Sequence, residues 1–178
     1  TIRLLGSSIA GTYTIAYRII LAIALPIITL IQAIQPRLIS AIQSGNRLAI
    51  RQLIKILLLA IAAYMPIAIL LTLAARHYLV TFLGQSFIET TQILLLLIPL
   101  LPLFSLRLLA GTLLSSLNKP AIRAVFELCA LGVLLLACSQ YIPSQGIRGT
   151  AISVLIAELF LLLCLSISAI YILKSVNG

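Results

Sequence analysis

The stretch LIKILLLAIAAYMPIAILLTLAA, residues 53–75, decides the fold of this chain of 178 residues. After Lys55 it carries no charge, and it is longer than the roughly 20 apolar residues that a helix needs to cross a bilayer. A soluble protein would have to cover such a helix with polar surface. Here 62% of the residues are hydrophobic and only 8% are charged. The composition therefore excludes a soluble globular domain and indicates an integral membrane protein.

Apolar runs on either side of this stretch predict an all-α, multi-pass transmembrane bundle of about five spans. The connections are short, so successive helices should pack antiparallel in one lobe. We expect the first span to stop at Gln35-Pro36-Arg37, the second at Arg76-His77 and the fourth at Pro143. The predicted spans cover residues 7–34, 53–75, 88–116, 121–142 and 147–173.

The basic residues predict an orientation. Lys and Arg number 12 against 3 Asp and Glu, and no basic tract interleaved with aromatic residues points to nucleic acid. The connections between the predicted spans fall on two sides of the membrane. The side with fewer basic residues has Arg3, Arg76 and Arg148, and the acidic Glu89 lies on this side too. The positive-inside rule places the richer side in the cytoplasm, which puts Thr1 outside and Gly178 inside. The richer side holds Arg37, Arg47, Arg51, Lys55, Lys119, Arg123 and Lys174.

Arg47, Arg51 and Lys55 recur at helical spacing. This spacing predicts an amphipathic helix along the cytoplasmic interface, although these charges would also serve topology alone. The chain begins with Thr1 rather than Met, and its first apolar stretch is too long for a signal peptide. We therefore expect it to be a piece of a longer protein.

Two arginines fall inside predicted spans, Arg18 in the first and Arg107 in the third. An arginine at the centre of a membrane helix is unfavourable by about 2.5–3.5 kcal/mol, so it normally faces water or a partner. Thr14 and Gln32 lie on the same helical face as Arg18. This pattern predicts a wet cavity with Arg18, Arg107, Thr14 and Gln32 as substrate-binding residues. The alternative is a structural ion pair or snorkelling, and it is stronger for Arg107, which lies closer to a helix end.

The acidic residues inside the spans are Glu127 and Glu158. Glu127 follows Arg123 by one helical turn, which predicts a local ion pair. Glu158 has no charged neighbour in its own helix. It would pair with Arg107 or Arg18 across the bundle, or titrate in a proton or sodium path, and we favour pairing.

Prolines inside the spans predict bends, with a double break at Pro99 and Pro102 just before Arg107. Pro26 and Pro66 should bend the first two spans. Bent helices with inward polar groups are common in transporters that alternate access.

No residue pattern points to catalysis or to a cofactor. His77 has no nucleophile or acid patterned near it, and neither Gly-x-Ser-x-Gly nor His-Glu-x-x-His occurs. The cysteines Cys129, Cys138 and Cys164 lie in apolar runs without metal-ligand spacing, so we interpret them as small packing residues. The sequence predicts no enzyme, no catalytic residue, no metal and no cofactor.

Four short motifs, in order, resemble a known family. Residues 11–19 (GTYTIAYRI) are similar to a G-x-Y-x-x-A-x-x-I helix start, and residues 82–87 (FLGQSF) to an L-F-G-like turn. Residues 116–119 (SLNK) are similar to a small-residue turn followed by Lys, and residues 143–151 (PSQGIRGTA) to a P-x-x-G-I-x-G-A-A opening. The chain resembles the C-terminal half of the polysaccharide and oligosaccharide-lipid flippases, in the multidrug/oligosaccharidyl-lipid/polysaccharide exporter superfamily.

The resemblance implies a function. Such proteins move undecaprenyl-pyrophosphate-linked oligosaccharides across the bacterial inner membrane by alternating access between two helical lobes. Arg18 matches the position of a cationic cavity residue in related flippases, and the expected partners are the lipid-linked oligosaccharide, membrane lipids and a missing N-terminal lobe. The N-terminus would be periplasmic and the C-terminus cytoplasmic, and this piece alone would be inactive. Two alternatives stay open: a cation-coupled multidrug antiporter of the same superfamily and a non-transporting structural membrane subunit.

Overall fold

The computed structural model describes residues 7–83 and 88–175, and the described residues form helices without a strand. Four helices are long and apolar enough to span a membrane, and a bent pair of shorter helices is a candidate for a fifth span. The chain is therefore an all-α, multi-pass membrane bundle, as its composition predicts. The helices are α2 (Ser7–Gln43), α3 (Arg47–Leu83), α4 (Ile88–Leu96), α5 (Leu100–Ser116), α6 (Pro120–Gln145) and α7 (Ile147–Ser175).

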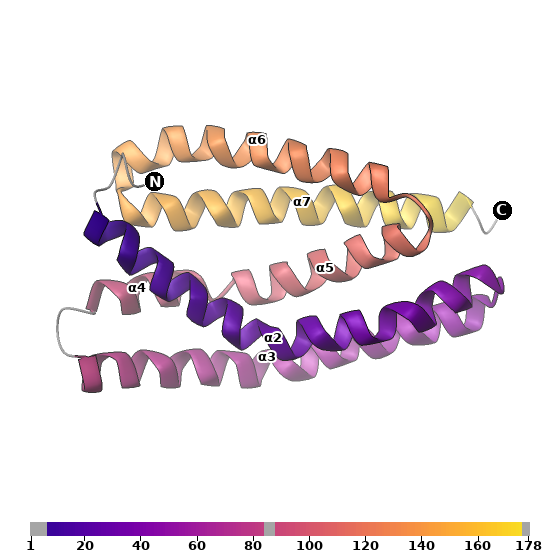
Figure 1. The fold of residues 1–178 in the computed structure, drawn as a ribbon, viewed down its shortest axis with the longest axis horizontal. Helices are drawn as coiled ribbons and strands as arrows, with labels where there is room; N and C mark the ends of the chain where they lie inside the picture. The colour runs from indigo at the N-terminus through magenta and orange to yellow at the C-terminus, as the bar shows by residue number, and fades with distance from the viewer. Residues whose placement is uncertain (1–6, 84–87, 176–178) are drawn as a thin grey trace.

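The helices pack as two antiparallel hairpins with the bent pair between them (Figure 1). The turns α2–α3 and α5–α6 meet at one end of the bundle, together with the C-terminal end of α7, and the α6–α7 turn lies at the other. At the first end, Arg47 begins α3 and Lys119 directly precedes α6. At the second end, Arg148 lies in the first turn of α7. The structure thus separates the two groups of basic residues as the charge count predicts. Arg3 lies outside the described residues.

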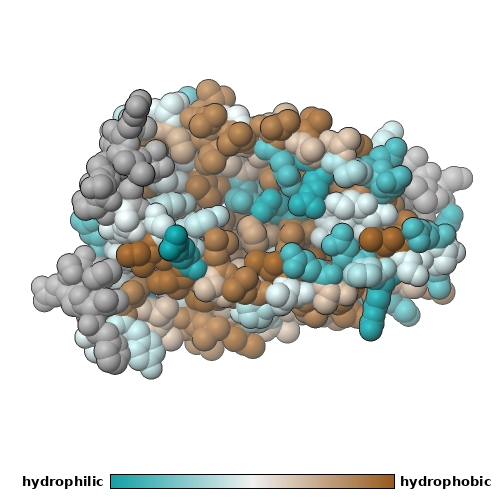
Figure 2. All heavy atoms as spheres, viewed as in Figure 1, coloured by the Kyte–Doolittle hydropathy of each residue, from teal (hydrophilic) through white to brown (hydrophobic). Residues whose placement is uncertain are grey.

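The surface of the bundle has the polarity of a protein in lipid. On the face drawn in Figure 2, hydrophobic side chains cover much of the surface, and hydrophilic side chains are most numerous toward the end with the α2–α3 turn. Leu70, Leu128 and Leu136 illustrate the exposure, since 66–69% of each residue is accessible. In water such a surface would be strongly unfavourable, so it must be covered by lipid or by other helices.

The third predicted span is a broken one. Helices α4 and α5 meet at an angle of 44° across a break that contains Pro99. Leu97, Leu100 and Leu101 are at most 1% exposed and lie buried at the bend. The predicted break at Pro99 is confirmed, whereas a second break at Pro102 is wrong, because Pro102 lies in the first turn of α5, where proline is tolerated. Burial of the leucines explains why the two pieces stay packed.

Two predicted helix ends on the hairpin α2–α3 are wrong. Helix α2 continues through Pro36 to Gln43, because Leu38 and Ala41 beyond the proline remain buried, Leu38 in one core cluster with Leu57 of α3. Arg47, Arg51 and Lys55 lie on the first turns of α3, so the separate interfacial helix is also wrong. The charged residues show where the apolar part of each helix ends. Both α2 and α3 continue beyond that point, because each packs against the other.

The predicted end of the second span at Arg76-His77 is wrong for the same reason. Helix α3 continues to Leu83, and Leu79, which follows these two residues, is buried. Helix α6 includes Pro143 and ends at Gln145, about three residues after the predicted end of the fourth span, which is within the few residues expected for a boundary. Of the predicted turn at residues 82–87, residues 84–87 lie outside the described residues.

Helix α2 changes direction near its middle, where Pro26 lies (Figure 1). Proline has no backbone N–H, so the carbonyl of Ala22, four residues before Pro26, loses its helical donor. The Tyr64 hydroxyl of α3 donates a hydrogen bond of 2.5 Å to the Ile23 carbonyl, one turn before the proline. The second helix of the hairpin thus supplies a donor beside the bend.

We expect Tyr64→Phe to lower the free energy of unfolding by about 1 kcal/mol, because the half-buried carbonyl loses this donor. Thermal unfolding of the purified chain in detergent, followed by circular dichroism, measures the change. Tyr171→Phe is the matched control, since Tyr171 is 75% exposed. Equal melting temperatures for the two variants would contradict the role of Tyr64.

A single residue joins α6 to α7. Gly146 has φ of +57° and separates Gln145, which ends α6, from Ile147, which begins α7. Such a φ favours glycine, because a Cβ makes it strained. Small side chains then let the two helices approach closely along their length. Buried small residues on this pair of helices include Ala130 and Ala137 of α6 and Ser153 and Ala157 of α7.

Candidate functional site

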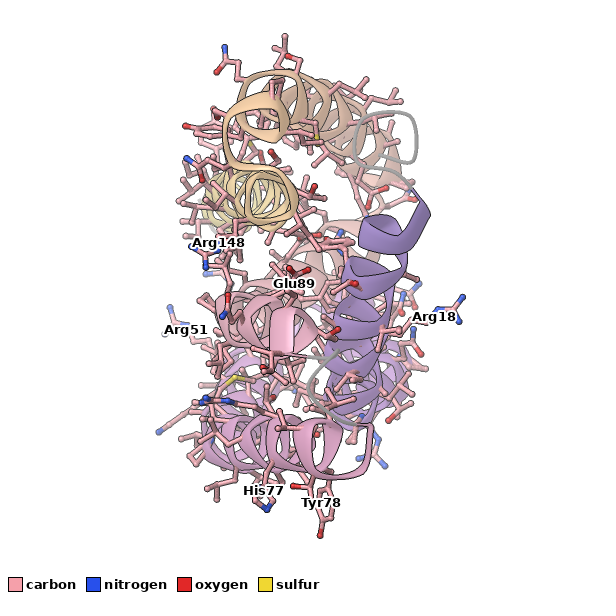
Figure 3. The ribbon with its side chains drawn as sticks, turned by 90° about the vertical axis from the view of Figure 1, so that its left-hand side faces the viewer. Arg18, Arg51, His77, Tyr78, Glu89 and Arg148 are labelled. Carbon is pink, nitrogen blue, oxygen red and sulfur yellow. The ribbon has the colours of Figure 1, made fainter. Side chains whose placement is uncertain are left out.

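Arg18 projects from α2 away from the rest of the bundle (Figure 3). Its side chain is exposed and forms no ion pair with a carboxylate among the described residues. Thr14 and Gln32 are exposed as well and lie on the same face of α2, within about 40° of Arg18 around the helix axis. The exposed face of α2 therefore combines a cation with polar residues, which is unfavourable against lipid tails. We call Thr14, Arg18 and Gln32 the α2 polar stripe.

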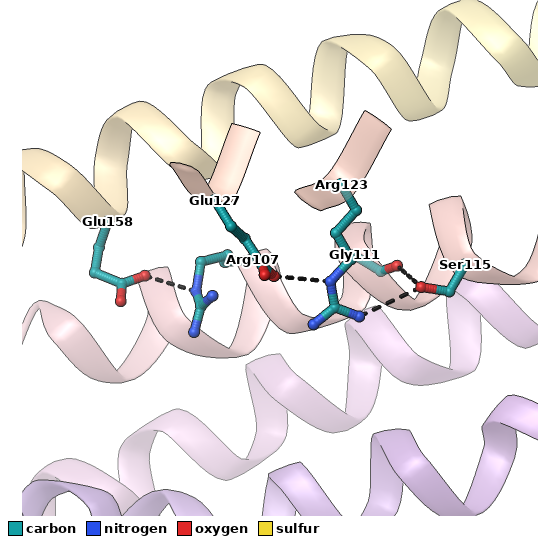
Figure 4. Close-up of polar contacts among 6 residues, drawn as sticks. All are labelled: Arg107, Gly111, Ser115, Arg123, Glu127 and Glu158. Carbon is teal, nitrogen blue, oxygen red and sulfur yellow. Dashed lines mark hydrogen bonds and ion pairs between the residues drawn. The ribbon is translucent and has the colours of Figure 1, made fainter. Parts of the chain in front are cut away.

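Arg107 and Glu158 form an ion pair between α5 and α7 (Figure 4). Arg107 Nε lies 2.7 Å from Glu158 Oε2, and the side chains are 18% and 17% exposed. The N–H direction does not meet hydrogen-bond geometry, so the attraction between opposite charges carries the contact. The Arg107 guanidinium also lies 4.8 Å from the centre of the Phe104 ring. The predicted pairing of Glu158 is confirmed, and its partner is Arg107 rather than Arg18.

A second arginine–glutamate pair lies nearer the α5–α6 turn. Arg123 donates from Nε to Glu127 Oε1 at 2.8 Å, which confirms the predicted local pair. Arg123 also donates from Nη1 to the Ser115 hydroxyl at 3.3 Å, so it links α6 to α5 (Figure 4). A Cβ on Gly111 would lie 3.3 Å from Arg123 Nε, so the bare backbone at this position leaves room for the guanidinium.

Tyr17 of α2 completes the surroundings of the Arg107–Glu158 pair. It interacts electrostatically with both charges, and its ring stacks on Tyr13 with centroids 5.8 Å apart. These tyrosines were not among the predicted site residues. Their spacing of four residues puts them on one helical face, and that signal could have found them.

Arg18 and Glu158 lie equally far into their own helices. Arg18 comes eleven residues after Ser7, the first residue of α2, and Glu158 comes eleven residues after Ile147, the first residue of α7. At 1.5 Å per residue this is about 16 Å, roughly half of a hydrocarbon core that is about 30 Å thick.

The described residues offer no group of three or more His, Cys, Asp or Glu that could hold a metal ion. The three cysteines are free. Cys138 and Cys164 are half-buried, in agreement with a packing role. Cys129 is exposed, so the expectation that it packs inside the bundle is wrong. Cys129 lies on the outer surface of α6, where an apolar side chain suits a lipid neighbour.

Fold and polar groups together define a polytopic helical membrane protein with arginines held at membrane depth. A family model described as polysaccharide biosynthesis protein matches residues 3–92, half of the chain, and the chain belongs to this family. No curated protein and no solved structure matches the chain. The protein therefore acts in polysaccharide biosynthesis or export. The matched region contains the whole α2 polar stripe, whereas Arg107 and Glu158 lie beyond it.

Proposed function

We propose that this chain is part of a transporter that moves a polyprenyl-pyrophosphate-linked oligosaccharide across the membrane by alternating access. The observation that carries the proposal is Arg18, an exposed cation near the middle of the bilayer with no carboxylate partner among the described residues. Membership of the polysaccharide biosynthesis family supports the cargo class. Thr14 lies one turn from Arg18, and Gln32 lies about 21 Å further along α2, so they add polar groups along the same helix that can bind phosphate or sugar oxygens.

The chemistry of the cargo matches these groups. A pyrophosphate carries negative charge that is highly unfavourable in lipid, so its path needs water and a compensating cation. The planar guanidinium of arginine binds phosphate oxygens through two parallel hydrogen bonds, which a point charge such as Lys does not reproduce. Arg18 is the candidate for this contact because Arg107 is already neutralised by Glu158.

The proposal includes a second helical lobe of the same transporter. The α2 polar stripe lies on the outside of the bundle, where lipid contact would be unfavourable for Arg18. Another set of helices facing this stripe would enclose a hydrated cavity between the two lobes. The chain by itself would then bind cargo weakly and would not transport it.

The orientation follows from the two ends of the bundle. We assign the end that carries the α2–α3 and α5–α6 turns to the cytoplasm, because it holds the excess of Arg and Lys. The membrane would be the bacterial inner membrane, with Thr1 on the periplasmic side. Cargo made on cytoplasmic lipids would then be carried outward.

The Arg107–Glu158 pair weighs against the antiporter alternative. A cation-coupled drug antiporter relies on an acidic group that is free to bind its ion or a proton. Glu158, the deepest acid in the described bundle, already faces a guanidinium at 2.7 Å. The structural-subunit alternative gives no reason for an exposed cation and polar residues on α2, which are unfavourable against lipid.

The test is replacement of Arg18 in cells that lack the gene and are complemented with its complete coding sequence. Arg18→Ala should lower surface polysaccharide about tenfold or more, because a charge-assisted contact to the pyrophosphate is lost. Arg18→Lys should retain part of the activity, since it keeps the charge without the planar fork. Polysaccharide is measured by gel staining at matched protein levels.

Arg76→Ala is the control, because Arg76 is an exposed arginine near the end of α3. It should leave polysaccharide unchanged. Normal polysaccharide from a well-expressed Arg18→Ala variant would overturn the role of Arg18 and favour the structural-subunit alternative.

A further inference from the structure

The α2–α3 hairpin carries a groove at its turn. The groove has a volume of about 420 Å³ and is lined by the last turns of α2 and the first turns of α3. Its polar lining includes Arg37, Ser40 and Gln52, and its apolar lining includes Leu53 and Ile56. It lies at the far end of α2 from Arg18, and none of the residues of the α2 polar stripe lines it.

Polarity changes along this groove from the turn toward the membrane. Ser40 and Ser44 lie within one or two turns of the hairpin tip, whereas Ile56 lies more than two turns into α3. Beyond Ile56 the chain is uncharged as far as Arg76. Polar lining therefore extends from the turn to Arg37 and Gln52, at about the depth of Leu53, and Ile56 continues the groove into the hydrophobic span. A phospholipid has the same order of polarity from headgroup to acyl chain.

Charge around the groove has a single sign. Arg37 is the cation that lines it, whereas Arg47, Arg51 and Lys55 lie on the opposite face of α3 from the groove. All acidic residues of the chain come later, the first being Glu89. An anionic headgroup in the groove would therefore meet Arg37 and no carboxylate from this hairpin. Each basic residue near an anionic membrane surface strengthens binding by about fivefold.

The free backbone N–H groups at the N-terminus of α3 do not form the anion site. The Asn46 side-chain oxygen accepts a hydrogen bond of 3.1 Å from the Ala49 N–H and so caps the helix. The Ser44 hydroxyl donates to the Ala41 carbonyl at 3.1 Å. The donors that remain for a headgroup are the side chains of Arg37, Ser40 and Gln52.

We infer that this groove binds one anionic phospholipid, with its phosphate at Arg37 and Ser40 and its acyl chains along Leu53 and Ile56. The site goes beyond cargo transport, because it concerns a resident membrane lipid at the end of the bundle that the positive-inside rule assigns to the cytoplasm. It would anchor the hairpin at the interface.

The chain has no tryptophan, so a single introduced tryptophan reports on one place. We place it at Ile56, which lines the groove and is 53% exposed. The Ile56→Trp chain is reconstituted in vesicles with brominated phosphatidylglycerol or brominated phosphatidylcholine, and quenching gives the relative association constants. We expect phosphatidylglycerol to be preferred by about fivefold or more. Leu136→Trp, on the exposed surface of α6, should show a ratio near one.

Arg37→Gln in the Ile56→Trp background should lower the preference about fivefold, whereas Lys119→Gln, which removes one charge at the same end, should leave it unchanged. Three results would overturn the site: a ratio near one in the Ile56→Trp chain, equal losses for the two charge variants, or displacement of the lipid by inorganic phosphate at matched ionic strength. The last would show that a soluble anion is the ligand.

Discussion

Gly149→Ala should lower the free energy of unfolding by about 3 kcal/mol or more, the upper end of what overpacking causes. A Cβ at this position would overlap the Tyr141 carbonyl oxygen and lie 2.5 Å from the Tyr141 carbonyl carbon. Both atoms belong to the backbone of α6, which cannot move aside as a flexible side chain would. The helices α6 and α7 would have to separate just after the turn at Gly146 that joins them.

Gly132→Ala provides the matched control on the same pair of helices. Nothing lies within 4 Å of a Cβ built on Gly132, so this substitution should stabilise α6 by up to about 1 kcal/mol through helix propensity. Thermal unfolding in detergent measures both variants. A Gly149→Ala protein as stable as the Gly132→Ala protein would show that α6 and α7 do not approach as closely as described.

Glu158→Leu should have the second-largest effect and destabilise the chain by about 3 kcal/mol. The reason is that Arg107 would keep its charge with only 18% of its side chain exposed. Arginine cannot lose its proton at any accessible pH, so it has no way to become neutral. Arg107→Leu should be less harmful, because the carboxyl group left behind can bind a proton.

The double variant Arg107→Leu/Glu158→Leu separates the ion pair from the packing. Replacing both partners of a largely buried pair with apolar residues is often neutral or stabilising, so the double variant should be more stable than Glu158→Leu alone. Unfolding of all four proteins gives the coupling energy. Additive effects would mean that the two charges do not interact across α5 and α7.

Much of the fold was predictable because each helix that crosses the bilayer needs about 20 consecutive apolar residues. Five apolar runs indicated the number of spans, and Pro99 indicated the break in the third. Helix ends were harder to predict, because a helix that leaves the membrane can continue wherever a partner helix buries its side chains. Leu38 shows this: it follows Pro36 yet is fully buried in a cluster with Leu57.

The charged residues of the candidate site could be found from the sequence, but their arrangement could not, and Tyr17 was not predicted. Arg18, Arg107 and Glu158 stand out because charges are rare inside membrane spans. The partner of Glu158 depends on how α2, α5 and α7 pack. These residues lie on three different helices, so the spacing of residues along one helix does not predict which of them meet. Tyr17 was missed because a tyrosine in a membrane helix is common, and only its neighbours make it informative.

The sequence by itself determined that this is a polytopic helical membrane protein, which of its ends is the more basic, and which charged residues lie at depth. Hydrophobicity and charge are properties of each residue alone, so they can be read along the chain. Only the tertiary structure decided that Glu158 neutralises Arg107, that Arg18 stays exposed, and that Gly149 lies against the backbone of α6. Those outcomes depend on distances between helices, which packing sets and no single segment encodes.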